Sequence, residues 1–360
     1  MKILSLMLIL VSSLLASLHA AEPGQAEYDQ ALAAAREGNY AATRSLLESA
    51  IEKGNVGALT YMGVLHETGS GVEQSYTKAS DWYQKAVAKG DAKAMYQLGY
   101  LYENGAGVER DFAKAMDLYG QAAAKGIGTA MLNLGIMHQT GKGVPQNFQE
   151  AMKWYRQASD QKVNSAMLYI AYLYEEGQGV PQNLTEAVSW YNKAIAHGNT
   201  SAMLELGLMY ERGKGVAQNL SEAIKNYKLA ADAGDTTGML YIGNLYAAGN
   251  GVAQNHEEAA RWYHRAAERN DPHAIVNLGL AYVDGKGVPR NPAHAVTLFR
   301  MASDMGYSQA TFNMGVVYEN GIGVAPNLET AREWFTKAHA QGHQGAMGAI
   351  VNVQRKIEQQ

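Results

Sequence analysis

The sequence of 360 residues contains no cysteine. A disulfide framework is therefore excluded, as is a thiol that could carry a lipid anchor, and the fold must be stabilised by packing. The sequence also lacks a large excess of charge of one sign: it has 30 basic and 34 acidic residues, and the formal net charge is −4. This balance argues against binding to nucleic acid or to an anionic membrane surface.

A long membrane-spanning run is missing as well. After Lys2, the apolar stretch at residues 3–18 is interrupted by serines and ends before Ala20 and Ala21. A span needs about 20 apolar residues, so a membrane anchor is the weaker alternative. The stretch predicts a cleavable secretory signal, with cleavage after Ala20 or Ala21.

A tetrapeptide, Gly-x-Gly-Val, recurs at a constant spacing of 36 residues. A fixed period of this length is typical of a repeat array, in which each repeat contacts only its neighbours. We therefore expect one elongated domain without β-strands. The valines that end the copies are Val72, Val108, Val144, Val180, Val216, Val252, Val288 and Val324.

Each repeat contains two stretches with helical periodicity. Before the glycines, Met95, Leu98 and Tyr102 lie at i, i+3 and i+7, and after them, Ala187 and Tyr191 lie at i and i+4. These spacings predict two amphipathic helices per repeat. We call them the first helix and the second helix, and we expect the Gly-x-Gly-Val loop to join them as a hairpin.

The ends of these helices carry their own signals. Asn147 stands just before a second helix and Glu150 follows three residues later, which predicts a reciprocal capping box. The first loop glycine, such as Gly69, is expected to end the first helix in the left-handed conformation. The second loop glycine should allow a tight turn, and the valine should pack back as an apolar plug.

With these features the array resembles the Sel1-like repeats, relatives of the tetratricopeptide repeat with a longer, glycine-bearing loop. The resemblance covers Gly57 to about Gly342 and departs at few positions, such as Ala171, which replaces the glycine of a Leu-Gly pair. It implies an all-α fold, a right-handed α-solenoid (superhelix) of helix-turn-helix repeats. It also implies that the first helices line a concave face.

The expected organisation has four parts. Residues 1–20 are a signal peptide, and residues 22–56 are an N-terminal capping hairpin of tetratricopeptide type. Residues 57–344 hold eight repeats, and residues 345–360 form a C-terminal capping helix that becomes polar in its second half. A polar terminal helix is how such a stack shields its last apolar surface.

One motif suggests catalysis. Ser75 and Lys78 match the Ser-x-x-Lys pattern of penicillin-recognising enzymes, so hydrolysis of a β-lactam or peptidoglycan bond is a remote hypothesis. Ser75 aligns with Asp111 of the next repeat, however, which favours a helix cap. His66 and His138 share one slot two repeats apart and cannot share a metal ion. We expect neither enzymatic activity nor a cofactor.

The resemblance places two residues of each first helix on the concave face. Two interpretations stay open: the stripe binds a partner segment with apolar anchors and basic flanks, or it packs against the neighbouring repeat. The stripe comprises Thr60, Val64, Tyr96, Tyr100, Leu132, Ile136, Leu168, Tyr172, Leu204, Leu208, Leu240, Asn244, Val276, Leu280, Phe312 and Val316, bordered by Glu67, Glu103, Glu175, Glu211 and Glu319.

These features together favour an exported, non-enzymatic scaffold that binds protein or peptide segments. We expect it to be a periplasmic monomer without a stable membrane anchor, organising or regulating an envelope complex. The alternatives are a factor secreted toward a host, acting in virulence or entry, and a eukaryotic luminal adaptor of the quality-control type. Fold alone does not decide among them.

Overall fold

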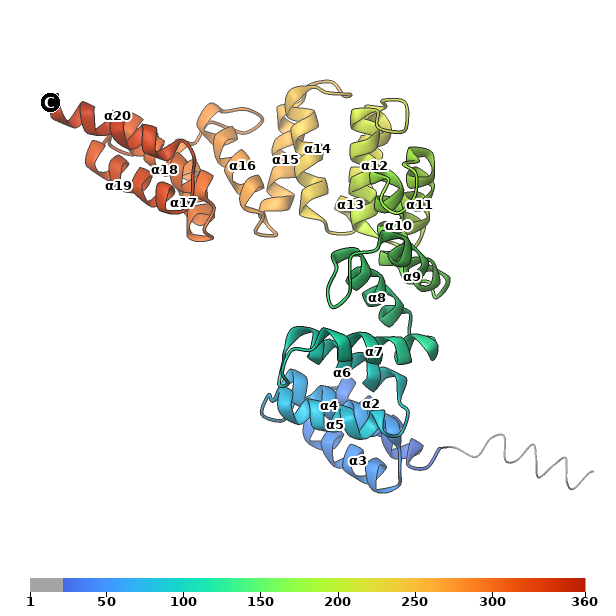
Figure 1. Cartoon of the computed structure of the whole chain (residues 1–360). Coiled ribbons are helices and arrows are strands. Elements are labelled where there is room, and N and C mark those ends of the chain that lie inside the picture. Colours follow the sequence, from blue (N-terminus) through green and yellow to red (C-terminus); the bar gives the residue numbers. More distant parts are fainter. Residues whose placement is uncertain (1–21, 360) are drawn as a thin grey trace, which may run out of the picture. The chain divides into compact units, whose positions relative to one another are not determined.

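The computed structural model describes residues 22–359, so the expected signal peptide lies outside the described residues. Within this range the chain forms nineteen helices and no strand (Figure 1). The chain divides between Pro181 and Gln182 into two compact units, unit 1 before the boundary and unit 2 after it. The predicted all-α solenoid of helix-turn-helix repeats is confirmed.

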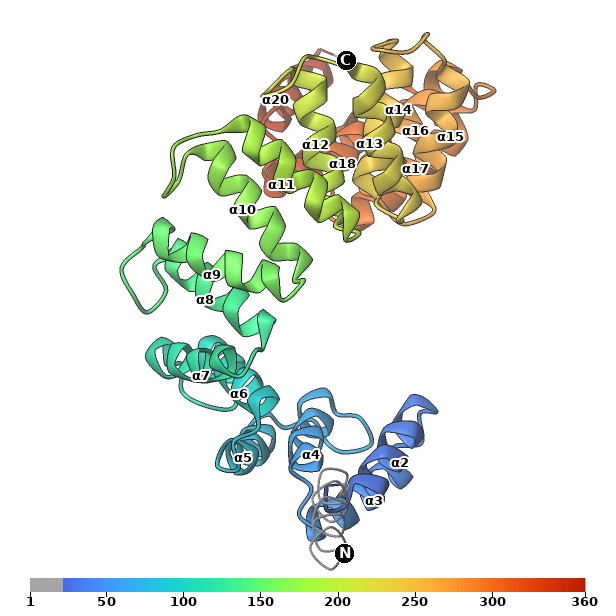
Figure 2. The ribbon, with the colours of Figure 1, turned by 90° about the vertical axis from the view of Figure 1, so that its right-hand side faces the viewer.

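In each unit, consecutive helices form hairpins and each hairpin packs on the next (Figure 2). Unit 1 contains α2 (Gln25–Arg36), α3 (Tyr40–Glu52), α4 (Val56–Thr68), α5 (Tyr76–Val87), α6 (Ala92–Asn104), α7 (Phe112–Ala124), α8 (Gly128–Thr140), α9 (Phe148–Asp160) and α10 (Asn164–Glu176). Unit 2 contains α11 (Leu184–Ala196), α12 (Thr200–Arg212), α13 (Leu220–Asp232), α14 (Thr236–Ala248), α15 (His256–Ala267), α16 (Pro272–Asp284), α17 (Pro292–Asp304), α18 (Ser308–Asn320), α19 (Leu328–Ala340) and α20 (Ala346–Glu358).

A buried aromatic ring joins the two helices of most hairpins. Its partner on the first helix is the glycine of the Leu-Gly pair: a Cβ added to Gly135 would lie 2.4 Å from Cε1 of Tyr155. The absent side chain therefore sets how closely the helices approach, and each ring removes a large apolar surface from water. The rings that meet a glycine in this way are Tyr83, Tyr119, Tyr155, Tyr227, Tyr263, Phe299 and Phe335.

The second loop glycine does more than allow a turn. A Cβ on Gly107 would lie 2.3 Å from the carbonyl carbon of Tyr76, and one on Gly287 would lie 1.9 Å from the carbonyl oxygen of His256. Tyr76 and His256 begin α5 and α15, the second helices of the preceding repeats. The loop of one repeat thus lies directly on its neighbour's backbone, which only glycine allows.

The predicted asparagine caps are confirmed, but the reciprocal glutamate contact is wrong. Asn147 Oδ1 accepts a hydrogen bond from the backbone N–H of Glu150 at 3.0 Å. The backbone N–H of Asn147 is already used, because it donates to the carbonyl of His138 at 2.8 Å. The Glu150 carboxylate therefore pairs with Lys153 at 2.7 Å instead.

A glutamine just before the cap residue makes a contact that the sequence analysis missed. Gln146 Nε2 donates to the carbonyl of Gln139 in the last turn of α8 at 2.8 Å. Gln218 repeats this bond with the carbonyl of Glu211 at 2.9 Å. The side chain thus satisfies a carbonyl that lacks an intrahelical partner. The recurrence of this glutamine at the repeat period could have predicted a shared structural role.

The C-terminal helix α20 packs on α19 through the buried residues Ala346 and Val353. Its other side is not polar along the whole length, because Met347 is 49% exposed and Val351 is 51% exposed. In preceding first helices, the residue aligned with Met347 is buried, as Met95 and Thr311 are. The first half of α20 therefore keeps the pattern of an internal first helix.

The ring–glycine contact can be tested with two glycines in unit 1. The change Gly135→Ala should lower the urea midpoint of unfolding, because its Cβ meets the Tyr155 ring; overpacking of this kind costs about 1–3 kcal/mol. Gly120 on α7 has no atom within 4 Å of an added Cβ. Gly120→Ala should therefore leave the midpoint unchanged or raise it through helix propensity. Equal effects of both changes would contradict the proposed role of the ring.

Candidate partner-binding surface

The first helices of unit 1 place the predicted stripe at partial exposure. On α6, Tyr100 is 44% exposed and Tyr96 is half-buried, with its ring centroid 5.7 Å from that of Tyr119. Leu132, Ile136, Leu168 and Tyr172 on α8 and α10 are also half-buried. The stripe therefore packs in part against neighbouring side chains and in part reaches solvent, and binding of a partner by these residues stays a prediction.

A groove of about 1090 Å³ lies beside α2, α4, α6 and α8 of unit 1. Thr60, Val64 and Tyr96 from the predicted stripe line it, together with residues of α2 and α8. Thr60 is itself buried and donates to Asp91 Oδ1 at 3.0 Å, and Asp91 caps α6. The floor of the groove thus contains a hydrogen bond that ties α4 to the start of α6.

Other residues of this groove were not predicted. Tyr28 and Tyr61 contribute aromatic surface, while Lys89 and Lys93 supply positive charge at its border. Tyr61 lies one position after Thr60, on the side facing the N-terminal hairpin, and its equivalents in later repeats vary between tyrosine, amides and glutamate. This variation within an otherwise regular helix could have indicated from the sequence that the position takes part in binding.

In unit 2 the stripe changes character along the array. Leu204 and Leu208 on α12 are half-buried, whereas on α16 Val276 is buried and Leu280 is 45% exposed. A second groove of about 350 Å³ lies beside Leu280, between α14, α15 and α16. The two units therefore offer different surfaces on their first helices.

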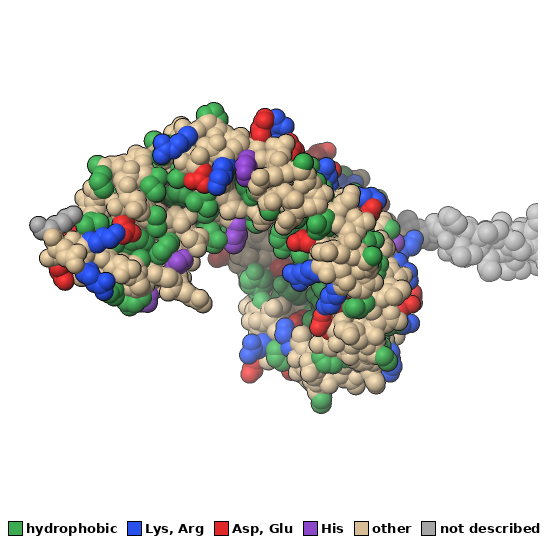
Figure 3. All heavy atoms as spheres, turned by 90° about the horizontal axis from the view of Figure 1, so that it is seen from above, with side chains coloured by type: hydrophobic (Ala, Val, Ile, Leu, Met, Phe, Trp, Pro, Cys, Tyr) green, Lys and Arg blue, Asp and Glu red, His purple; other side chains and the backbone are tan. Residues whose placement is uncertain are grey.

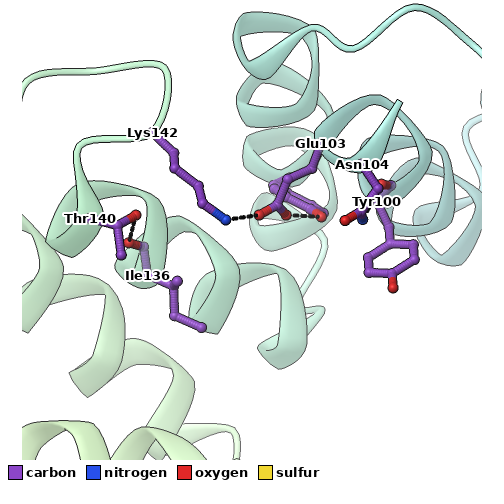
Figure 4. Close-up of polar contacts among 7 residues, drawn as sticks. Tyr100, Glu103, Asn104, Ile136, Thr140 and Lys142 are labelled. Carbon is purple, nitrogen blue, oxygen red and sulfur yellow. Dashed lines mark hydrogen bonds and ion pairs between the residues drawn. The ribbon is translucent and has the colours of Figure 1, made fainter. Parts of the chain in front are cut away.

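The glutamates that border the stripe are engaged within the protein. Glu103 Oε2 accepts a hydrogen bond from the Tyr119 hydroxyl at 2.9 Å, and its other oxygen pairs with Lys142 of the next repeat's loop at 3.3 Å. Figure 4 shows Lys142 reaching toward Glu103 while the ring of Tyr100 points away from this pair. Glu103 therefore gives less support to the expectation that a partner carries basic flanks, because its carboxylate already bonds Tyr119 and Lys142.

The same arrangement recurs where a tyrosine and a glutamate stand 16 residues apart. The Tyr83 hydroxyl donates to Glu67 at 2.5 Å, and the Tyr227 hydroxyl donates to Glu211 at 2.6 Å. Glu175 is buried. Glu319 pairs with Lys356 of α20 at 2.7 Å. These border glutamates thus bond within the protein: Glu67 and Glu211 to a core tyrosine, Glu319 to α20, and Glu103 to both a core tyrosine and the next repeat.

Burial raises the pKa of these tyrosines above the ordinary value, because the phenolate would lose hydration. For Tyr83 and Tyr227 the hydrogen bond to glutamate adds to the effect. Burial alone raises the pKa of Tyr263 to about 12. The hydroxyls thus act as neutral donors throughout the physiological range of pH.

Ser75 has the helix-cap role that the sequence analysis favoured over catalysis. Ser75 Oγ accepts a hydrogen bond from the backbone N–H of Lys78 at 3.3 Å and caps α5. Among residues 22–359, no group of three or more His, Asp or Glu side chains has the arrangement of a metal site. None of the helices in that range is both long enough and apolar enough to cross a bilayer.

Charged side chains are mixed over the visible surface. On the face shown in Figure 3, acidic and basic side chains are interspersed, with hydrophobic side chains between them. This face therefore presents no field of a single sign that would attract a polyanion.

Comparison with known proteins agrees with the repeat geometry. A family model described as Sel1 repeat matches eight consecutive segments: 56–91, 92–127, 128–163, 164–199, 200–235, 236–271, 272–307 and 308–343. These begin one residue before the expected 57–344. No curated protein matches the sequence.

Two solved structures are similar over most of the chain. One is a Sel1 repeat protein from Oxalobacter formigenes, with 28% identity, a TM-score of 0.68, and coverage of 86% of this chain and 90% of that one. The other is a protective antigen present in uropathogenic Escherichia coli strains and displaying an SLR fold. It has 25% identity, a TM-score of 0.52, and coverage of 96% and 90%.

The raised pKa of Tyr263 predicts a loss of stability in alkali. Between pH 10 and 12 the unfolded chain releases the phenolic proton and the folded chain keeps it, so stability falls as the pH rises. Tyr263→Phe should reduce the loss between pH 10 and 11 by roughly 1 kcal/mol. Urea midpoints measured at both pH values test this, with Tyr76→Phe at an exposed site as the control. An identical pH dependence in the two variants would contradict the assignment.

Proposed function

The chain belongs to the Sel1 repeat family, and on this premise we propose that it is an exported, non-enzymatic scaffold that binds a segment of a partner protein. Sel1 repeats generally serve as non-catalytic interaction modules. We further propose that it works in the periplasm, where it organises or regulates an envelope complex. Its partner is a protein, and the scaffold itself is a monomer.

The observation that supports binding is the groove of unit 1. At about 1090 Å³ it is large enough to take several side chains of a partner. Tyr28, Tyr61 and Tyr96 offer aromatic surface with a polar end, a combination that is enriched at protein interfaces. The bond between Thr60 and Asp91 keeps the floor in place, so little ordering is required when a partner binds.

The chemistry of the groove suggests its occupant. Apolar and aromatic lining residues suit hydrophobic anchors of a helical or extended segment. The border carries Lys89 and Lys93 of one sign and Glu22 of the other. We therefore propose a partner segment with apolar anchors and charges of both signs, in place of the purely basic flanks suggested by the glutamate border.

Export is supported by the N-terminal sequence alone. Lys2, the apolar stretch at residues 3–18 and the small residues Ala20 and Ala21 have the order of a secretory signal. The absence of cysteine removes one means of lipid attachment at the signal junction. A periplasmic destination follows if the source cell has two membranes.

A second candidate is a role outside the cell, in contact with a host. The protein of uropathogenic Escherichia coli that resembles this chain over 96% of its length is described as a protective antigen. On that likeness, we propose secretion toward a host as the alternative. The binding surface is the same in both cases, and only the partner differs.

Photo-crosslinking tests whether a partner contacts the exposed part of the stripe on α6, one turn beyond Tyr96 of the groove. A photoreactive phenylalanine at Tyr100, which is 44% exposed on α6, should give a discrete adduct in living cells. The matched control places the same group at Gln121, which is exposed on the second helix α7. The adduct should form with the photoreactive group at position 100 and not at position 121. Mass spectrometry then identifies the crosslinked protein. Adducts at Gln121 alone would place the working surface on the second helices instead.

Export has a separate test. Expressed in full in a Gram-negative cell, the protein should appear in the periplasmic fraction with an intact mass that begins at Ala21 or Glu22. Leu8→Arg places a charge in the middle of the apolar stretch and should retain the uncleaved chain in the cytoplasm. An uncleaved wild-type chain in the cytoplasmic fraction would refute export.

A further inference from the structure

Two repeats in unit 2 lack the glutamate of the border. Residues 272–307 carry Val283 there and Phe299 in place of the tyrosine, so within unit 2 only residues 236–271 keep the tyrosine without its glutamate. At the position of Glu103 and Glu211, residues 236–271 carry Ala247. The Tyr263 hydroxyl instead donates to Asn244 Oδ1 at 2.8 Å. The ring is kept, but its carboxylate partner is missing.

The lysine that would pair with this glutamate is nevertheless present. Lys286 occupies the loop position that Lys142 holds in the repeat after Glu103. Lys142 reaches the Glu103 carboxylate at 3.3 Å, whereas Lys286 pairs with Asp284 beside its own loop at 2.9 Å. Both side chains of that second pair are about half exposed, at 59% and 48%. An exposed pair of this kind is weak and can be exchanged for another carboxylate.

Three further departures in the same repeat leave room beside Lys286. His256 stands where other second helices begin with Phe112, Phe148 or Leu220. Ala260 stands where they carry Met116, Met152 or Ile224. Asn244 stands where other first helices carry Ile136 or Leu208. The result is the groove of about 350 Å³, which Ala247, Tyr263, Lys286 and the exposed Leu280 also line.

From this juxtaposition we propose that the groove of α14, α15 and α16 binds an acidic segment of a partner protein. A glutamate or aspartate side chain of the partner takes the place that Ala247 leaves empty. Its carboxylate pairs with Lys286, as Glu103 pairs with Lys142. The inference rests on the proposed function, because it names the chemistry of one partner segment.

Neighbouring groups fit this occupant. Asn277 lines the groove and its Nδ2 lies 3.3 Å from Asn244 Oδ1, so an amide donor stands close to the incoming carboxylate. Leu280 provides an apolar contact for the residue next to the acidic one. Asp284 is the one carboxylate among the described lining residues, and it competes with the partner for Lys286.

A random peptide library displayed on phage provides the test. Peptides recovered on the purified protein are synthesised in pairs, one with the acidic residue and one with its amide. Dissociation constants are then measured by fluorescence anisotropy. The acidic form should bind roughly tenfold more tightly, because a charge-assisted bond is lost in the amide.

Matched variants locate the site. Ala247→Glu restores the internal carboxylate and should weaken binding about tenfold, as should Lys286→Gln. Asp284→Asn removes the competitor and should strengthen binding. Lys228→Gln, at an exposed site on α13, is the charge control and should change nothing. Ala247→Glu completes the arrangement found in other repeats, so its urea midpoint should not fall below that of the wild type.

The outcomes separate this inference from the proposed function. Peptides that bind wild type and Ala247→Glu equally, but lose affinity for Tyr96→Ala, would overturn the acidic site and retain the groove of unit 1. Peptides without an acidic requirement would also overturn it. Failure to recover any binding peptide would count against both proposals.

Discussion

The contact between an aromatic ring and a glycine is the interaction on which most of the repeats depend. The ring of Tyr155 occupies the space where a Cβ of Gly135 would lie, so the two helices approach more closely than side chains on both would permit. In the tyrosine repeats, the ring also carries a hydroxyl that reaches the last turn of the first helix or the turn before it. Tyr83, Tyr119 and Tyr227 donate there to a glutamate, whereas Tyr155 and Tyr263 donate to the amide oxygens of Gln139 and Asn244. Core packing and surface polarity are therefore coupled through one side chain.

The period, the two helices of each repeat, the asparagine caps and the loop glycines could be predicted because they depend on residues close in sequence. The capping box was wrong because sequence does not reveal that the backbone N–H of Asn147 has the His138 carbonyl as a partner. The glutamate border looked free for a similar reason. The partners of Glu103, for example, are a tyrosine of the same repeat and Lys142 of the next repeat. Partial burial of the stripe likewise depends on contacts between repeats.

The two grooves show how a regular array acquires recognition. In unit 1 the repeats keep their pattern, and binding surface arises from variable positions such as Tyr61 beside the constant ones. In unit 2 the groove arises from departures within one repeat, where Ala247 replaces a charged residue, Ala260 a larger one and His256 an apolar one. A fold whose repeats contact only their neighbours can accept such departures, because each loss of packing stays local.

The spacing of 39 residues between a border position and the next loop also bears on how the array can change its length. Loss of residues 236–271 in frame would bring Lys286 opposite Glu211, a complementary pair in place of the present Ala247 and Lys286. Recombination between repeats could therefore remove this segment and gain an ion pair. What the shortened chain would lack is the groove beside Leu280. Packing alone gives no reason to retain this repeat, whereas a ligand does.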